Sequence, residues 1–379
     1  MILVLLPAAA LTLATLLPAL AWRGVLALAR RPAPRFLRRA LIAHAALLAL
    51  HVLVTVPLAL GFLARVVTTR GDEQAWRGPR LDGDGNWQVQ TRESLAAERE
   101  RPAATDGATG PAPDGGAGEH ALFFPSRDGV RLRAFLVPHR GAPAAPPAFA
   151  AVLVHGLYRG GLELEPVGAM LRDLGGEVLL LELRNHGGSG RARPTFGLDE
   201  SQDVLAAVDV LRRRPEAAGR PLVLFAVSVG TAAAALAAPA IPDLAGLVLD
   251  APLDDLGAVA DRMLRAGSGG RRGPGLPQPF RALVLWSARN LAGAPLDEVR
   301  PAEALRRLPP RVPVLLIGAG HDVRVPPERV RALFDRLPTE AGRKELWIVP
   351  EAEHGRVWFE DPDGYRERLA RFVAELRRP

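Results

Sequence analysis

Cysteine is absent from the 379 residues of the chain. Disulfide bonds, a catalytic thiolate and zinc sites built on cysteine are therefore excluded, while both redox compartments stay open. Lysine is almost absent as well, because Lys344 is the single lysine and arginine supplies the remaining basic charge. This arginine, alanine, glycine and proline bias is typical of a GC-rich coding sequence rather than of low complexity.

Acidic residues are missing from residues 1–70, which hold eight arginines. The whole chain has a net charge of +7, so residues 71–379 carry a net charge of −1. The basic excess therefore lies beside the apolar N-terminal segments and not on the large domain. We interpret it as a determinant of membrane topology, and we expect no nucleic-acid partner.

Two N-terminal segments contain no charged residue. Residues 2–21 and 40–64 are predominantly apolar, and as helices they would span about 30 and 37 Å, enough for a hydrocarbon core of about 30 Å. They predict a two-helix membrane anchor over residues 1–66. A signal peptide is the competing interpretation of the first segment, but it normally begins with basic residues, and the first one here is Arg23.

The loop between these segments predicts the orientation of the chain. Residues 22–39 contain six arginines and no acid, so the positive-inside rule places the loop in the cytoplasm. The large domain that follows would then lie on the outer side of a bacterial cytoplasmic membrane. Arginines that follow the second segment oppose this orientation; they are Arg65, Arg70, Arg77 and Arg80.

Residues 67–118 predict a flexible linker, because they are rich in glycine, proline, alanine and charge and have no sustained periodicity. Within the linker, polar residues follow the spacing of a calcium-binding loop, but Trp87 stands where that loop needs glycine. We therefore interpret them as a turn cluster and expect no metal. They are Asp82, Asp84, Asn86, Gln88 and Glu93.

Strand and helix patterns alternate through residues 119–379, and several of the strands are continuous apolar runs, as in strands covered on both faces. The pattern predicts an α/β domain with a doubly wound, mainly parallel sheet. We expect strands at 121–124, 130–137, 149–154, 177–183, 221–227, 244–249, 312–317 and 345–349. We expect helices at 162–174, 200–213, 229–238, 327–337 and 363–376.

Sites in such sheets form beyond the carboxyl ends of the strands, and Ser228 stands at one of these ends. A nucleophilic serine there needs a sharp strand-to-helix turn, which requires small residues two positions before and after it. Ala226 and Gly230 satisfy this requirement. Taken alone, the motif fits equally well a serine that only caps an ordinary helix.

Further strand ends supply the other groups of a serine hydrolase. Asp322 and His354 follow the strands at 312–317 and 345–349, and the chain order serine, aspartate, histidine is that of the nucleophile-elbow hydrolases. Backbone N–H groups of Leu157 and Val229 would form the oxyanion hole. Asp250 also ends a strand and is the alternative acid of the triad.

These motifs resemble those of the α/β-hydrolase fold serine hydrolases, in the branch of membrane-linked esterases and serine aminopeptidase-like proteins. The resemblance covers residues 121–379 and implies the fold and the triad, but no substrate. Where that family usually has Asp-x-Arg-Gly-His-Gly, this chain has Glu182 at the first position and Asn185 at the fourth. The matching segments are VHGLYR, LELRNHGGSG, TFGLDESQDV, AVSVG, GAGHDVRVP and VPEAEHG.

Three further histidines have structural interpretations. His155 is expected to brace the oxyanion loop, His186 to brace a turn, and His321 to lie at the surface. The alternative for each is a direct role in catalysis.

Residues 253–308 occupy the place where the resembled fold inserts its cap. Residues 279–291 predict an apolar helix, which is either a lid over an acyl pocket or a helix packed on the core. Residues 267–275 predict a mobile hinge. Asp254, Asp255 and Asp261 form an acidic cluster of the kind that would bind a free α-amine.

Together these features predict a membrane-anchored serine hydrolase. It would cleave carboxylic esters or thioesters of a small or lipid-like acyl substrate through an acyl-enzyme, without a cofactor. Two alternatives stay open, a serine aminopeptidase-like peptidase and a catalytically idle interaction protein with the same fold.

Overall fold

The computed structural model describes residues 80–81, 87–88, 120–139, 147–157, 160–266, 278, 280–290 and 294–376. The chain divides into two units, and helix α8 (Phe280–Asn290) belongs to a different one from the sheet. The expected apolar helix at 279–291 thus exists, and whether it acts as a lid stays a prediction. The expected hinge at 267–275 lies outside the described residues.

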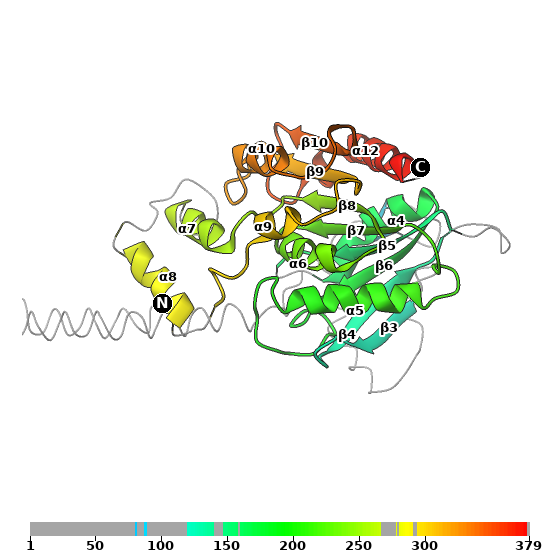
Figure 1. The fold of residues 1–379 in the computed structure, drawn as a ribbon, viewed down its shortest axis with the longest axis horizontal. Coiled ribbons are helices and arrows are strands. Elements are labelled where there is room, and N and C mark those ends of the chain that lie inside the picture. Colours follow the sequence, from blue (N-terminus) through cyan, green and yellow to red (C-terminus); the bar gives the residue numbers. More distant parts are fainter. Residues whose placement is uncertain are drawn as a thin grey trace, which may run out of the picture. The chain divides into compact units, whose positions relative to one another are not determined.

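An eight-stranded sheet forms the centre of the larger unit (Figure 1). Strand β4 is antiparallel to β3 and β6, and the other neighbouring pairs are parallel, which confirms the mainly parallel α/β sheet. In spatial order the strands are β10 (Lys344–Val349), β9 (Val314–Ala319), β8 (Leu244–Asp250), β7 (Leu222–Val227), β5 (Phe149–Val154), β6 (Gly176–Glu182), β4 (Arg131–Val137) and β3 (His120–Pro125).

The central strands β5, β6 and β7 are buried along their whole lengths. Their apolar sequences suit strands whose two faces are both covered by helices. From β5 the chain moves to one side to form β6 and then to the other side to form β7. This reversal makes the carboxyl ends of β5 and β7 the switch point, where sites of this architecture form.

Helices cover both faces of the sheet. Helix α4 (Glu165–Asp173) lies against α12 (Pro362–Glu375) over one face, while α5 (Glu200–Arg212), α6 (Val229–Ala237) and α9 (Pro301–Leu305) pack in sequence over the other (Figure 1). Because α9 packs on α6, the last part of the expected cap belongs to the helical layer. Helix α10 (Pro327–Asp335) packs on β9 and β10.

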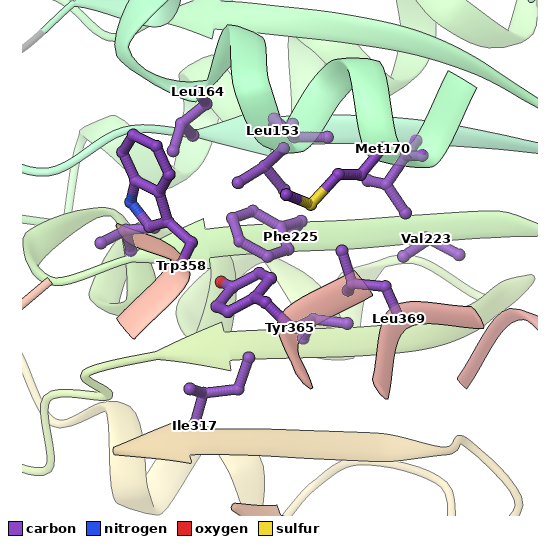
Figure 2. Close-up of a cluster of buried hydrophobic side chains, with 14 of the residues drawn as sticks. Leu153, Leu164, Met170, Val223, Phe225, Ile317, Trp358, Tyr365 and Leu369 are labelled. Atoms are coloured by element: carbon purple, nitrogen blue, oxygen red, sulfur yellow. The ribbon is translucent and has the colours of Figure 1, made fainter. Parts of the chain in front are cut away.

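The face under α4 and α12 holds an apolar cluster (Figure 2). Leu153 and Phe225 supply alternate strand residues, which point to one face, and Met170 and Leu369 reach them from the two helices. Tyr365 is fully buried there, and its ring centroid lies 6.5 Å from that of Phe225. The cluster therefore anchors α12, whose tyrosine approaches the ends of the central strands.

Differences from the expected elements are local. The helix expected at 162–174 begins as a 3₁₀ turn, η1 (Gly161–Leu164), before α4. Strand β9 starts two residues later than expected because Val312 is still in a turn, with its N–H bonded to Pro309. Three helices were not expected, namely α7 (Leu256–Ala266), α9 and α11 (Val357–Glu360).

The N-terminal predictions fall mostly outside the described residues. None of the described helices is long and apolar enough to cross a membrane, and the expected spans at 2–21 and 40–64 lie in the part of the chain that is not described. Within the expected linker, β1 (Arg80–Leu81) pairs with β2 (Trp87–Gln88) in antiparallel fashion. Of the calcium-type spacing, only Gln88 is described, and it lies in β2.

Candidate active site

Ser228 lies between β7 and α6 in a strained backbone conformation, with φ 53° and ψ −124°. Non-glycine residues rarely adopt a positive φ, and such strain is typical of nucleophile elbows. The turn is held by the Ser228 N–H, which donates to the Asp250 carbonyl at 2.9 Å, and by the Thr231 N–H, which donates to the Ser228 carbonyl at 2.9 Å. The serine hydroxyl is thereby presented beyond the strand.

The turn is tightly packed, which confirms the requirement for small residues. A Cβ atom on Gly230 would lie 2.4 Å from the His155 carbonyl oxygen, so no larger residue fits there. A Cβ atom on Gly156 would lie 3.3 Å from the Ser228 Cβ. The end of β5 therefore adjoins the serine, as the expected oxyanion loop requires.

The structure brings the three expected triad residues together. His354 Nε2 lies 2.7 Å from Ser228 Oγ, and His354 Nδ1 lies 2.6 Å from Asp322 Oδ2. A carboxylate bonded to Nδ1 favours the tautomer in which Nδ1 carries the proton and Nε2 accepts one from the serine. The arrangement can therefore activate Ser228 as a nucleophile.

Asp322 is held in a preformed carboxylate site. Its Oδ1 accepts the backbone N–H groups of Arg324 at 2.8 Å and Val325 at 2.9 Å, while Oδ2 faces the histidine. The side chain is fully buried, and that of His354 is 12 % exposed. Three hydrogen-bond donors thus stabilise the charged form of the acid.

The loops that carry Asp322 and His354 are bonded to each other. The Gly320 N–H donates to the Val349 carbonyl at 2.8 Å, and the His321 N–H donates to the Ala352 carbonyl at 3.0 Å. A Cβ atom on Gly320 would lie 2.0 Å from the Pro350 carbonyl oxygen, so only glycine permits this approach. The acid and the base are therefore positioned as one unit.

Asp250, the alternative acid, has a different role. It is fully buried at the end of β8, and its Oδ2 accepts the Tyr365 hydroxyl at 2.9 Å. Burial raises the pKa of Asp250 to about 7; the Tyr365 bond lowers it, and the nearby Asp322 and Glu163 raise it. No hydrogen bond links it to His354 among the described residues, so the histidine is oriented by Asp322.

The expected oxyanion donors stand beside the nucleophile. Val229 is the first residue of α6, where backbone N–H groups have no partner within the helix. Leu157 follows Gly156, which touches Ser228. Both N–H groups stay predictions as donors to a reacting oxygen.

Of His155, His186 and His321, the first two brace loops. His155 Nε2 accepts the Leu183 N–H at 3.1 Å, so its Nδ1 carries the proton and donates to the Gly156 carbonyl at 2.7 Å. His186 Nδ1 bonds the Arg184 carbonyl at 2.9 Å. His321 is exposed.

The acidic residues of the cap region are already engaged. Asp254 bonds Arg262 of α7 and Arg329 of α10. Asp255 accepts the Ala258 N–H at 2.8 Å at the start of α7, and Asp261 pairs with Arg265. Burial raises the pKa of Asp254, but the bonds from the two arginines outweigh it and the net direction is down. Asp254 therefore joins separate elements, whereas Asp255 and Asp261 bond groups of α7, and all three carboxylates are engaged rather than available to an amine.

The loop after β6 is held by charged residues, of which only Glu182 stood out in the sequence. Fully buried Arg184 bonds Asp203 of α5 at 2.7 Å and Asp128 of the β3–β4 turn at 2.8 Å. Glu182, at the position where the resembled family has aspartate, pairs with Arg133 at 2.6 Å. Asn185 has φ 66°, a conformation that glycine and asparagine tolerate, which explains the replacement of the family's glycine.

Among the described residues, no three histidine, aspartate or glutamate side chains form a group that could hold a metal ion. The chemistry that the arrangement offers is the attack of an activated serine hydroxyl on an acyl carbon.

Comparisons with known proteins agree with this geometry. Two curated relatives are the uncharacterized protein YfhR of Escherichia coli O157:H7, 26% identical over 264 residues, and the uncharacterized protein YqkD of Bacillus subtilis, 24% identical over 259 residues. Each alignment covers 68% of this chain, and they cover 82% and 79% of the respective relatives.

Among solved structures, the esterase Pf2001 of Pyrococcus furiosus superposes with a TM-score of 0.55 at 21% identity, over 68% of this chain and 90% of the esterase. At that identity the likeness shows the fold alone. A model of the alpha/beta hydrolase family matches residues 151–368, more than half of the chain and all three candidate triad residues. The chain therefore belongs to the alpha/beta hydrolase family.

Proposed function

We propose that this protein is a serine hydrolase that cleaves carboxylic esters or thioesters. The observation that carries the proposal is the continuous hydrogen-bonded series from Ser228 through His354 to Asp322. It is supported by the strained elbow at Ser228 and by the fold that the chain shares with a solved esterase.

The reaction follows from the geometry. His354 Nε2 takes the Ser228 proton as the serine oxygen bonds to the acyl carbon, and the Leu157 and Val229 N–H groups bond the developing oxyanion. The imidazolium then gives its proton to the leaving alcohol or thiol, which departs and leaves an acyl-serine. His354 then takes a proton from a water molecule as that water attacks the acyl-serine. The imidazolium returns this proton to the serine oxygen as the ester bond breaks, which releases the acid and restores the free serine.

The described site favours an ester over a free amino terminus. An aminopeptidase needs carboxylates that are available to an α-amine, and Asp254, Asp255 and Asp261 already bond arginine side chains or a helix N-terminus. A catalytically idle protein would have no need for a strained elbow or for a histidine poised between serine and aspartate. Small or lipid-like acyl esters are therefore the substrates to examine first.

The nucleophile is tested by Ser228→Ala with a fluorophosphonate probe and a panel of acyl esters, thioesters and aminoacyl amides. The variant should lose probe labelling, and its turnover should fall by about 10³-fold or more, because the attacking oxygen is gone. Ser201→Ala is the matched control, since Ser201 lies on α5 and bonds only local groups. Equal labelling of wild type and Ser228→Ala would reject the proposal.

We also propose that the hydrolase is anchored in the membrane with its active site outside the cytoplasm. Two uncharged apolar segments and the arginine-rich loop between them support this arrangement. A site held near a membrane surface would reach lipid-like or envelope esters, which suits the proposed substrate class.

A further inference from the structure

Asp250 stands between the two sides of the active site. Its strand, β8, lies between β7, which leads to Ser228, and β9, which leads to Asp322. The Asp250 carbonyl accepts the Ser228 N–H at 2.9 Å, and the next residue, Ala251, donates its N–H to the Ile317 carbonyl of β9 at 2.9 Å. This segment thus ties the nucleophile turn to the strand of the triad acid.

The nearby Thr231 strengthens the same connection. Its hydroxyl donates to the Ser228 carbonyl, and its oxygen accepts the Leu253 N–H at 3.0 Å. Residues 250–253 are therefore bonded to both ends of the serine turn. A change in the charge of Asp250 would occur within this hydrogen-bonded network.

The surroundings of the Asp250 side chain favour a neutral carboxyl group. It is fully buried, and the groups that act on it are the Tyr365 hydroxyl from α12 and two acids, Asp322 from the β9–α10 loop and Glu163 from η1. Its Oδ1 has no hydrogen-bond partner among the described residues. An ionised carboxylate with one donor and acidic neighbours is far more costly to bury than a protonated one.

Asp322 has the opposite environment, although the two acids interact electrostatically. Two backbone N–H groups and the histidine donate to Asp322, whereas Tyr365 is the one donor to the Asp250 side chain within the described part of the chain. Two neighbouring carboxyl groups with such unequal numbers of donors take different protonation states. Of the two acids, Asp250 is the one whose burial favours the protonated form.

We propose that Asp250 is a positioning residue that stores a proton behind the triad, and that release of this proton places a second negative charge near Asp322. This inference rests on the proposed hydrolase function. The second charge would stabilise the imidazolium of His354, so that the free base forms only at higher pH. Tyr365 would regulate the release, because its hydroxyl bonds the ionised form of Asp250 more strongly than the neutral form.

The test is the acid limb of the pH profile of kcat/KM for ester hydrolysis, measured on the full-length protein. Asp250→Asn keeps the shape of the side chain but cannot ionise, so the midpoint of the limb should move down by about half a pH unit or more. Tyr365→Phe should move it in the same direction, because Asp250 then stays protonated to higher pH. Added to Asp250→Asn, Tyr365→Phe should cause no further shift.

Asp254→Asn is the matched control, since it places the same substitution at a buried aspartate four residues along the chain. Its midpoint should equal that of the wild type, because Asp254 is paired with arginines rather than facing the triad acid. An unchanged midpoint in Asp250→Asn, or an equal shift in Asp254→Asn, would overturn the inference.

A second measurement separates this inference from the proposed function. The titration midpoint of the His354 imidazole, followed by NMR and assigned with a His354→Gln variant, should fall in Asp250→Asn whether or not any ester is hydrolysed. An imidazole shift without turnover would reject the esterase and keep the stored proton. Ester turnover with identical imidazole titrations in wild type and variant would keep the esterase and reject the stored proton.

Discussion

At the residue scale, the choice between two acids is decided by hydrogen-bond donors. Asp250 ends β8 and Asp322 lies in the loop after β9, and both lie near the nucleophile turn. Among the described residues, only Asp322 accepts backbone N–H groups at its carboxylate and only Asp322 bonds the histidine. The sequence shows the positions of both residues but not the donors around them.

Asp322→Asn should therefore cost far more activity than Asp250→Asn. The amide at 322 would bond the wrong tautomer of His354, so kcat should fall by about 10⁴-fold. Asp250→Asn should change kcat by much less, because it removes no bond to the histidine. Steady-state kinetics on both variants, with folding checked by circular dichroism, decide the matter. A larger loss in Asp250→Asn would assign the triad acid to Asp250.

Sequence reasoning located Ser228, Asp322 and His354 because each belongs to a short local pattern at a strand end. It missed the Tyr365–Asp250 bond because 115 residues separate the partners. Tyr365 also lies in an ordinary amphipathic helix, where burial of an aromatic residue gives no sign of a polar partner.

At the element scale, Asp254 ties three parts of the fold. It lies in the loop between β8 and α7, and its side chain bonds Arg262 of α7 and Arg329 of α10. Asp254→Ala would leave both arginines without this partner, so the free energy of unfolding should fall by about 2 kcal/mol. Asp261→Ala is the control, because its partner Arg265 is exposed and surface pairs contribute about 0.5 kcal/mol. Denaturant titrations should show a larger loss of unfolding free energy for Asp254→Ala than for Asp261→Ala. Equal losses would contradict a stabilising role of Asp254 between α7 and α10.

Most elements could be predicted because their apolar runs are long and their turns contain glycine or proline. Helix α7 was missed although it had a signal, since Asp255 precedes it and caps the Ala258 N–H. Helix α11 has four residues, too few for any periodicity to show. The expected β9 began too early because the apolar pattern does not distinguish the turn at Val312 from the strand that follows.

At the scale of the whole molecule, Asp250 makes stability depend on pH. Its pKa is about 7 in the fold against a reference of 3.8, so the folded protein binds the proton more tightly than the unfolded chain. This stabilisation is fully present below about pH 4 and is lost as the pH rises to about 7, a loss of about 4 kcal/mol. Thermal unfolding should show that Asp250→Asn, relative to wild type, gains stability over this interval. A parallel pH dependence of the two proteins would contradict it.

The orientation of the chain is a second prediction at this scale. An alkaline phosphatase fusion after Arg80 should be active, because six arginines hold the loop at 22–39 in the cytoplasm and the chain then emerges outside. A cytoplasmic-type reporter at the same site is the control and should be inactive. The reverse pair of results would place the hydrolase in the cytoplasm and remove envelope esters from its substrates.

The bonds between the Gly320 and Pro350 loops also make the triad depend on one edge of the sheet. The acid and the base follow β9 and β10, which lie together at that edge, whereas the serine follows a central strand. A chain in which β9 and β10 have not joined the sheet would have Ser228 but neither the base nor the acid beside it. Such a chain would be inert, so hydrolytic activity would report the completed sheet.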